Sequence, residues 1–269
     1  MVRGWINLSR HGWKRSVVTC TVALMTGSGI FTSALAQTSE PMTIEANDFL
    51  EWNQSEGIYI AEGDAVAIQG SSEIRGNVLR ASYDPDAEDR AIETVIATGN
   101  VYYKDEQSTA RGQKLIYNVG DGNYQVDGPD ASVAGARGTI SADKVIMLET
   151  RADNSQFLNA NGKAVYRDST GRVFAGDNLN AYFDAEGALQ TLDAEGDVLV
   201  TTENGRQATG DAATYDAASE NATLTGNVSI IDGGNRMNGG RAEVDFKTGN
   251  SRMLSDGSTK RVSGVLIAN

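Results

Sequence analysis

The feature that most constrains the fold of this chain is a short phrase around a glycine that recurs along most of its length. Two copies read Thr98-Gly99-Asn100-Val101 and Thr225-Gly226-Asn227-Val228. The recurring glycines are separated by 36, 29, 34, 34, 30 and 31 residues, and a second glycine follows each closer copy after 13 or 14 residues. This period predicts an array of repeated structural units. The first glycines are Gly63, Gly99, Gly162, Gly196 and Gly226, with looser copies at Gly128 and Gly257; the second are Gly76, Gly112, Gly176, Gly210 and Gly239.

Apolar or small residues follow each second glycine at every other position. Side chains that alternate in this way lie on one face of a β-strand, while the residues between them lie on the other face. The intervening positions are mostly polar, so the pattern predicts antiparallel strands with one apolar and one wet face. The apolar sets are Leu79, Ala81 and Tyr83; Leu115, Tyr117 and Val119; Leu179, Ala181 and Phe183; Ala213, Tyr215 and Ala217; and Ala242, Val244 and Phe246.

The recurring phrase itself also alternates, with Val95, Ala97, Val101 and Tyr103 sharing one parity around Gly99. A glycine inside such a strand predicts a β-bulge or a tight bend. Residues 131–151 keep strand character but shift the spacing, and we interpret them as an irregular copy of the repeat. After residue 40, no segment of convincing length has helical periodicity.

Residues 1–36 have the features of a secretory signal peptide. Four basic residues precede an apolar run that ends in Ala34-Leu35-Ala36, a small-x-small cleavage site. The alternative is an uncleaved membrane anchor, because the run is almost long enough to span a bilayer. Cleavage would remove Cys20 and His11, the only cysteine and histidine of the chain. The mature chain would then lack a thiolate nucleophile, a disulfide, a histidine base and a zinc or haem site with Cys or His ligands.

The charge of the chain argues against a nucleic-acid partner. The formal net charge of −13 becomes −17 when the four basic residues of the signal are removed. Nucleic-acid affinity depends on neutralising phosphates with Lys and Arg, which so acidic a chain does not supply. Basic residues gather near the C-terminus, where they could meet lipid phosphates or an acidic partner, or form an ordinary solvated surface. They are Arg236, Arg241, Lys247, Arg252, Lys260 and Arg261.

A row of short strands with one apolar face must bury that face. The sheet can fold over on itself as a jelly roll or coil as a solenoid, and its first and last strands then remain open edges. Both terminal strands are apolar, which favours strand addition by partners, although they could simply complete the sheet. The residues that we predict at these partner edges are Ile44, Ala46, Val262, Val265 and Leu266.

Several of these segments resemble the OstA-like repeat of the LptA family of lipopolysaccharide transport proteins. The resemblance covers about residues 42–268, but this chain is longer than expected for the family and its third copy is irregular. The segments are Ile44-Glu45-Ala46, Gly63 to Gly70, Leu79 to Asp84, Leu224 to Val228, Gly239 to Val244 and, at the C-terminus, Ser255-Asp256, Lys260 to Val262 and Val265-Leu266.

This resemblance implies an all-β, twisted, open β-jelly roll, a solenoid-like array of antiparallel strands. It implies a periplasmic carrier that shelters lipopolysaccharide acyl chains inside the fold. It also implies head-to-tail self-association, with an LptC-like inner-membrane partner and an LptD-like outer-membrane partner joined by strand addition. We expect one domain over residues 37–269, with room for two repeat blocks at about 37–150 and 151–269.

The apolar face is the candidate lipid-binding site, and the alternative is a dry core. Inward alanines such as Ala81, Ala97, Ala160, Ala181 and Ala194 suggest unfilled room for acyl chains. The predicted inner-face residues are Leu79, Tyr83, Leu115, Tyr117, Leu179, Phe183, Leu192, Val198, Leu224, Val228, Val244 and Phe246.

Other functions fit the residues less well. Carboxylates are abundant, but they lie mainly at turns and on the wet face, whereas acid–base catalysis needs a buried, perturbed pair. We therefore expect no enzyme, no catalytic residue, no cofactor and no metal. Asp84, Asp86 and Glu88 have the spacing that begins a calcium loop, but Asp89 occupies the place of the required glycine. Two alternatives remain: a membrane-anchored, LptC-like component of the same pathway and a secreted structural or adhesive β-array without lipid.

Overall fold

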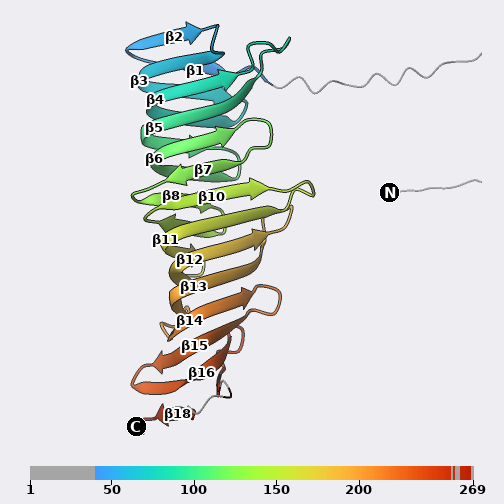
Figure 1. The fold of residues 1–269 in the computed structure, drawn as a ribbon. Coiled ribbons are helices and arrows are strands. Elements are labelled where there is room, and N and C mark those ends of the chain that lie inside the picture. Colours follow the sequence, from blue (N-terminus) through green and yellow to red (C-terminus); the bar gives the residue numbers. More distant parts are fainter. Residues whose placement is uncertain (1–39, 256, 258–260, 268–269) are drawn as a thin grey trace, which may run out of the picture. The chain divides into compact units, whose positions relative to one another are not determined.

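The computed structural model describes residues 40–255, 257 and 261–267, and the predicted signal peptide lies outside them. The described part is an array of antiparallel strands (Figure 1), which confirms the all-β fold class. None of the described residues forms a helix with the length and apolar character needed to cross a membrane. The strands are β1 (Thr43–Glu45), β2 (Phe49–Asn53), β3 (Ile58–Gln69), β4 (Ser72–Tyr83), β5 (Ile92–Lys104), β6 (Ser108–Asn118), β7 (Tyr124–Asp127), β8 (Ala131–Gly135), β9 (Gly138–Ala142), β10 (Val145–Thr150), β11 (Gln156–Asp168), β12 (Val173–Phe183), β13 (Leu189–Thr201), β14 (Gln207–Asp216), β15 (Asn221–Asp232), β16 (Asn235–Asp245), β17 (Ser251–Leu254) and β18 (Ser263–Val265).

Each long strand pairs with the next one along the chain, and each crosses two facing half-sheets. Half-sheet A contains β2, β7, β10 and β17, and half-sheet B contains β1, β8, β9 and β18. The strands β3–β6 and β11–β16 run through both half-sheets, so each forms one complete rung. Four rungs are instead made of two short strands with a break between them: β1 with β2, β7 with β8, β9 with β10, and β17 with β18.

The recurring glycines lie where a strand passes from one half-sheet to the other. In β3, the register shifts between Glu62 and Ala65, and Gly63 and Asp64 have positive φ angles of 91° and 44°. Two consecutive left-handed residues insert the extra length of a β-bulge and turn the strand. The predicted bulges are therefore confirmed, with the same pattern at Gly99-Asn100, Gly162-Lys163, Gly196-Asp197 and Gly226-Asn227.

The second glycine of each repeat faces a bulge on the neighbouring strand. A Cβ atom at Gly176 would lie 3.0 Å from the carbonyl oxygen of Glu195, and one at Gly210 would lie 3.1 Å from that of Thr225. Since these distances are too short for an ordinary carbon–oxygen contact, glycine lets the two backbones approach at the bend. The pair of glycines thus explains why the sheet folds over along one line.

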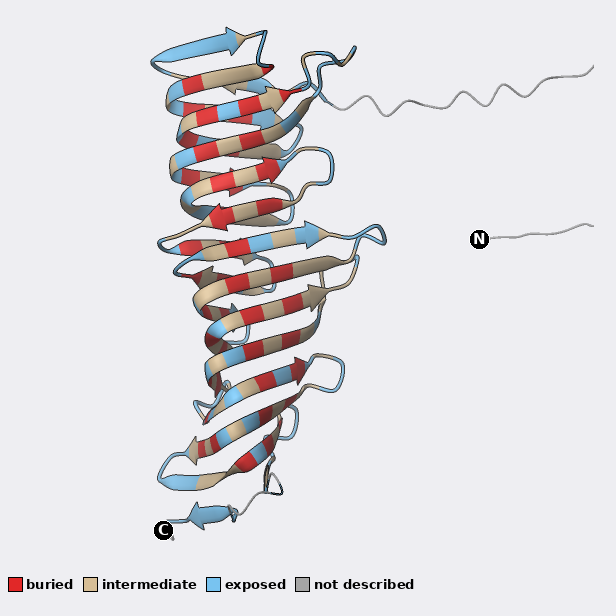
Figure 2. Cartoon of the chain, viewed as in Figure 1, coloured by how far each residue is buried: buried red, intermediate tan, exposed pale blue. Residues whose placement is uncertain are grey.

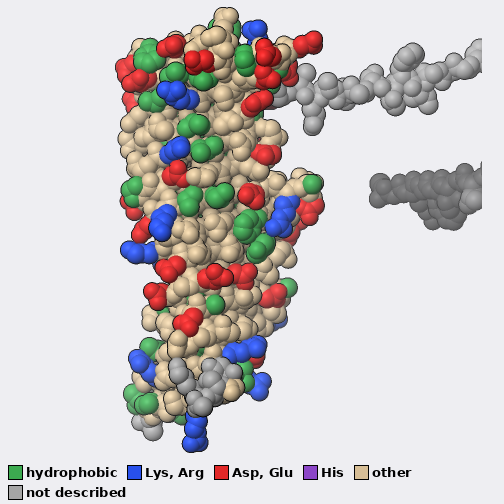
Figure 3. Space-filling model, in the orientation of Figure 1, with side chains coloured by type: hydrophobic (Ala, Val, Ile, Leu, Met, Phe, Trp, Pro, Cys, Tyr) green, Lys and Arg blue, Asp and Glu red, His purple; other side chains and the backbone are tan. Residues whose placement is uncertain are grey.

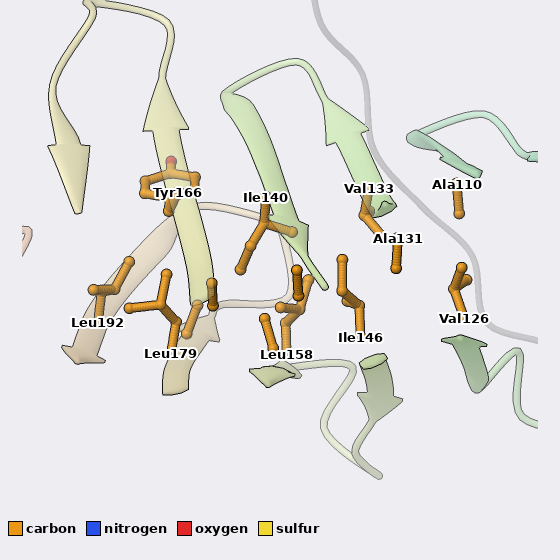
Figure 4. Packing of buried hydrophobic residues seen from close by; sticks show 14 of the residues in the cluster. Ala110, Val126, Ala131, Val133, Ile140, Ile146, Leu158, Tyr166, Leu179 and Leu192 are labelled. Carbon is orange, nitrogen blue, oxygen red and sulfur yellow. The ribbon is translucent and has the colours of Figure 1, made fainter. Parts of the chain in front are cut away.

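The core lies between the half-sheets. Along the long strands, buried residues alternate with more exposed ones (Figure 2), as expected for a sheet with one face in the core. Figure 4 shows Ile140 and Tyr166 of half-sheet B opposite Ile146, Leu158 and Leu179 of half-sheet A. No polar or charged side chain of the described residues is buried in this core.

Candidate functional site

The interior between the half-sheets is where the sequence places its candidate site. Phe183 and Phe246 are partly buried and pack against the core, while the other predicted inner-face residues are buried in it. Their contact with lipid remains a prediction. The buried ones are Leu79, Tyr83, Leu115, Tyr117, Leu179, Leu192, Val198, Leu224, Val228 and Val244.

The inward alanines stand beside large apolar residues of the adjacent strands. Leu79 stands between Ala61 and Ala97 on adjacent strands, and Leu179 stands between Ala160 and Ala194. Large and small side chains thus alternate across the strands. Close packing places the larger side chain of one strand beside the small one of the next, so the buried leucines occupy the space beside these alanines.

The turns at the two ends of each rung form facing margins, one from each half-sheet, and two groups of aromatic residues close the interior there. In the first closure, Tyr103 of half-sheet B meets Tyr117 and Tyr124 of half-sheet A, with ring centroids 5.4 and 5.1 Å apart. The Tyr103 hydroxyl donates a hydrogen bond of 2.8 Å to Asp105 Oδ2. Burial raises the pKa of both Tyr103 and Tyr124 further above physiological pH, because the apolar surroundings disfavour the charged phenolate.

The second closure combines aromatic rings with an arginine. Phe174 of half-sheet B meets Tyr215 and Phe246 of half-sheet A, at centroid distances of 5.0 and 5.7 Å. Arg172 of half-sheet B donates a hydrogen bond of 3.0 Å to the Tyr215 hydroxyl. Its guanidinium carbon also lies 5.6 Å from the Tyr215 ring centre and 5.5 Å from that of Phe246. A planar, always charged guanidinium suits this combined hydrogen-bonding and stacking role.

Carboxylates hold Arg172 in place. Asp168 Oδ2 accepts a hydrogen bond from Arg172 Nε at 2.5 Å, and Glu220 of the opposite margin lies 3.7 Å from Nη1. Burial alone would raise the pKa of Asp168, but hydrogen bonds from Arg172 and Thr170 outweigh it and hold this pKa below its usual value. The carboxylate therefore keeps its charge, and its ion pair with Arg172, to a lower pH than an ordinary aspartate would.

A pocket of about 380 Å³ opens between the two closures. Its volume falls within the range of ligand pockets. Tyr124 of the first closure lines the pocket. Tyr166 also lines it, and its ring centroid lies 6.4 Å from that of Phe174 in the second closure. Its apolar wall includes Val133, Ile140, Leu148, Leu158, Ala181 and Phe183, and its polar rim includes Asp105, Gln107, Arg137 and Glu186.

The sequence singled out Phe183 in this pocket, and Tyr117 and Phe246 in the closures, but it did not name Tyr103, Tyr124, Phe174 or Arg172 as site residues. The alternation around Gly99 already placed Tyr103 on the inward face, and Phe174 shares the inward parity of Gly176, so alternation could have found Phe174 too. Arg172 lies in a turn and closes the interior through the distant Tyr215, Phe246 and Glu220, which alternation cannot reveal.

The outer edges of the first and last rungs carry exposed apolar side chains. Among the described residues, β1 and β2 pair only with β3, and β17 and β18 pair only with β16. At the C-terminal edge, Val262, Val265 and Leu266 are exposed as edge residues would be. At the N-terminal edge, Ile44 and Ala46 instead pack partly against the core. The exposed residues there are Phe49, Leu50 and Trp52 of β2, which the sequence analysis missed.

The structure gives no support for a metal site in the described part of the chain. No group of three or more His, Cys, Asp or Glu side chains there is arranged to hold an ion. Within the candidate calcium loop, Asp84 Oδ1 accepts the backbone N–H of Asp86 at 2.9 Å, the bond of an Asx turn. This geometry assigns the segment a turn-forming role.

Comparison with known proteins identifies the family. The family model described as LptA/(LptD N-terminal domain) LPS transport protein matches residues 43–153 and, again, residues 136–250. The chain belongs to this family. The resemblance seen in the sequence is thereby confirmed, and lipopolysaccharide transport is the general role of this LptA-like chain.

One solved structure that is similar to this LptA-like chain is LptH of Pseudomonas aeruginosa. Its description is the LptA homologous periplasmic component of the conserved lipopolysaccharide transport device. The two share 14% identity over 85% of this chain and 96% of that one, with a TM-score of 0.22. A comparison with curated proteins finds no match.

Proposed function

We propose that this LptA-like chain is a periplasmic carrier that binds lipopolysaccharide acyl chains between its two half-sheets. The observation that carries the proposal is the pocket between the two closures, because it leads from the surface to the apolar interior. Burying acyl chains is favourable by about 0.8 kcal/mol per methylene, so a groove of moderate length holds a lipid without any charged contact.

The proposed route keeps the sugar and phosphate groups of the lipid outside. The rim of the pocket carries Asp105, Gln107, Arg137 and Glu186, whereas its wall carries Leu148, Leu158 and Phe183. Polar groups lose free energy when they are buried without partners, so the head group stays at the rim and only the acyl chains enter. The chain itself needs no catalytic residue for such a transfer.

The same proposal assigns the open edges to partners. Exposed N–H and C=O groups of an edge strand can pair with a strand of another protein. The edges of β1–β2 and β17–β18 would serve an LptC-like inner-membrane protein, an LptD-like outer-membrane protein and further copies of this chain. Passage of lipid from one chain to the next then needs no soluble intermediate.

Placing a charge on the pocket wall tests the proposal. We expect Leu148→Glu to weaken lipopolysaccharide binding to the purified chain at least tenfold, because the carboxylate would face the acyl chain. Leu148 is partly buried and lines the pocket, at the border of the core rather than inside it. Binding is measured by titration with lipopolysaccharide, and circular dichroism checks that the variant is folded.

The matched control is Met147→Glu on the same strand. Met147 is exposed on the outer face of β10, next to Leu148, and receives the same charge. We expect its affinity to equal that of the unsubstituted chain. Equal weakening by both substitutions, or by neither, would contradict binding in this pocket.

A further inference from the structure

Two rungs of the array are built alike although one lies at its edge and the other at its middle. At the break between β1 and β2, the N–H of Asn47 donates to the Gly63 carbonyl oxygen at 2.7 Å. At the break between β9 and β10, the N–H of Asp143 donates to the Gly162 carbonyl oxygen, also at 2.7 Å. The N–H groups of the next residues, Asp48 and Lys144, donate to the carbonyl oxygens of the residues before these glycines, Glu62 and Asn161, at 3.0 and 3.2 Å. The rung β9–β10 is thus a second copy of the first rung of the array.

The rungs β7–β8 and β17–β18 are alike in the same way. Each breaks opposite the second glycine of the preceding strand, Gly112 in β6 and Gly239 in β16. A Cβ atom at Gly112 would lie 2.6 Å from the Asp127 carbonyl oxygen, and one at Gly239 would lie 2.8 Å from that of Leu254. The rung β7–β8 is therefore built like the last rung of the array.

These likenesses give the chain an internal joint, where a last rung meets a first rung. There β8 pairs with β9 and β7 pairs with β10, both antiparallel. The two segments that match the family also meet in this region, at residues 136–153. This places the boundary between the two repeat blocks in the turn between Gly135 and Gly138, before the predicted position near residue 150.

We infer that this internal joint is the template of the joint between two copies of the chain, in which β17–β18 of one copy pairs with β1–β2 of the next in the same register. The inference rests on the head-to-tail association proposed above and specifies which strands of the two copies pair and in which register. One chain would then correspond to two single-block copies that are joined head to tail and covalently linked.

The internal register fixes which residues meet. Leu50 corresponds to Ile146. Leu50 pairs with Ala61 and Ile146 pairs with Ala160, and each of these alanines lies two residues before the bulge glycine of its strand. Ile146 pairs with Val126 in the internal joint.

The same alignment on the other side of the joint gives the partner residues. Val126 pairs with Leu115, and Met253 pairs with Ala242. Leu115 and Ala242 each lie three residues after the second glycine of their strand. Leu50 of one copy therefore meets Met253 of the second copy, and Glu51 meets Arg252 of the second copy.

Burial supports this alignment. Ile146 is 0% exposed because β7 covers it, whereas Leu50 is 54% exposed at an edge that no described strand covers. In the proposed joint, β17 of the second copy covers Leu50 as β7 covers Ile146. Trp52 would face Ser251, at the position where Leu148 faces Tyr124 in the internal joint.

Charge complementarity also points to a second copy. Residues 40–74 contain several carboxylates and neither Lys nor Arg, whereas residues 235–255 contain four basic side chains, Arg236, Arg241, Lys247 and Arg252, against two carboxylates. On the face drawn in Figure 3, acidic side chains gather around the first strands and basic ones around the last. Opposite charges at the two ends of one chain attract head to tail and oppose head-to-head contact.

Charge reversal at the predicted pair tests the inference in the secreted chain, residues 37–269. We expect sedimentation to show assembly that grows with concentration and weakens with salt. Glu51→Arg or Arg252→Glu alone should weaken association at least tenfold, because like charges then face each other across the joint. The two together should restore it to within about threefold of the original value. Glu195→Arg, an exposed position on β13, is the control and should change nothing.

A cysteine pair tests the register independently, since residues 37–269 contain no native cysteine. Leu50→Cys combined with Met253→Cys should form disulfide-linked oligomers, and Leu50→Cys combined with Ser251→Cys should not. A chain that stays monomeric at all concentrations, a double reversal without rescue, or cross-linking in the shifted pair would overturn the inference. Lipid binding to Leu148 and Met147 variants is measured separately, so failure of assembly remains distinguishable from failure of the carrier function.

Discussion

Replacing Leu179 with alanine should lower the free energy of unfolding by about 2–5 kcal/mol, the range for a fully buried leucine. Leu179 is 0% exposed and lies between Ala160 and Ala194 on the neighbouring strands. Because those neighbours are already small, they cannot close over the cavity that the substitution leaves. The measurement is a denaturant titration followed by circular dichroism.

The adjacent Asn180 provides the control for this prediction. It lies on the outer face, where it accepts a hydrogen bond of 2.7 Å from Asn159. Asn180→Ala should cost about 1 kcal/mol or less, the net contribution of one such bond. A Leu179→Ala loss no greater than that of the control would mean that the interior is loosely packed.

Gly162→Val should lower the free energy of unfolding by about 3 kcal/mol. Gly162 has a φ of +93°, where a β-branched residue is strained by about 1–3 kcal/mol. In addition, its Cβ would lie 2.7 Å from Lys144 Cγ and 3.0 Å from the Lys144 backbone nitrogen. The substitution therefore strains the strand and also pushes β10 away from β11.

Gly187→Val separates the two causes. Gly187 has a φ of +73°, but a Cβ there would meet nothing within 4 Å. We expect this turn variant to lose about 1–2 kcal/mol, from backbone strain alone. If the two variants unfold at the same denaturant concentration, the close approach of β9–β10 to the bulge is not a significant constraint.

The sequence predicted the parts of the fold that are set locally. The alternation around Leu179 and Val228 assigned both residues to the core face, since neighbouring side chains of a strand must point in opposite directions. The recurring glycine predicted the bulges, because few residues other than glycine adopt positive φ readily. The fold class followed from these two patterns together with the family resemblance.

The features that depend on distant pairing could not be predicted. The break at Asp143 and Lys144 was visible only as an irregular spacing, and its likeness to the first rung became clear from hydrogen bonds to Gly162. Arg172 meets Tyr215 across 43 residues, and Phe49 is exposed only because no described strand covers β2. Each of these depends on which rung lies beside which, and alternation along one strand does not contain that information.

The most direct test of the carrier function is photo-crosslinking in living cells. A photoreactive residue would replace Phe183 or Leu148, which line the pocket, with Asn180 and Met147 of the outer face as controls. Binding between the half-sheets predicts lipopolysaccharide adducts at the two pocket positions and none at the outer ones. No adduct at either pocket position, with the protein folded and abundant, would contradict the proposed function and leave the interior a dry core.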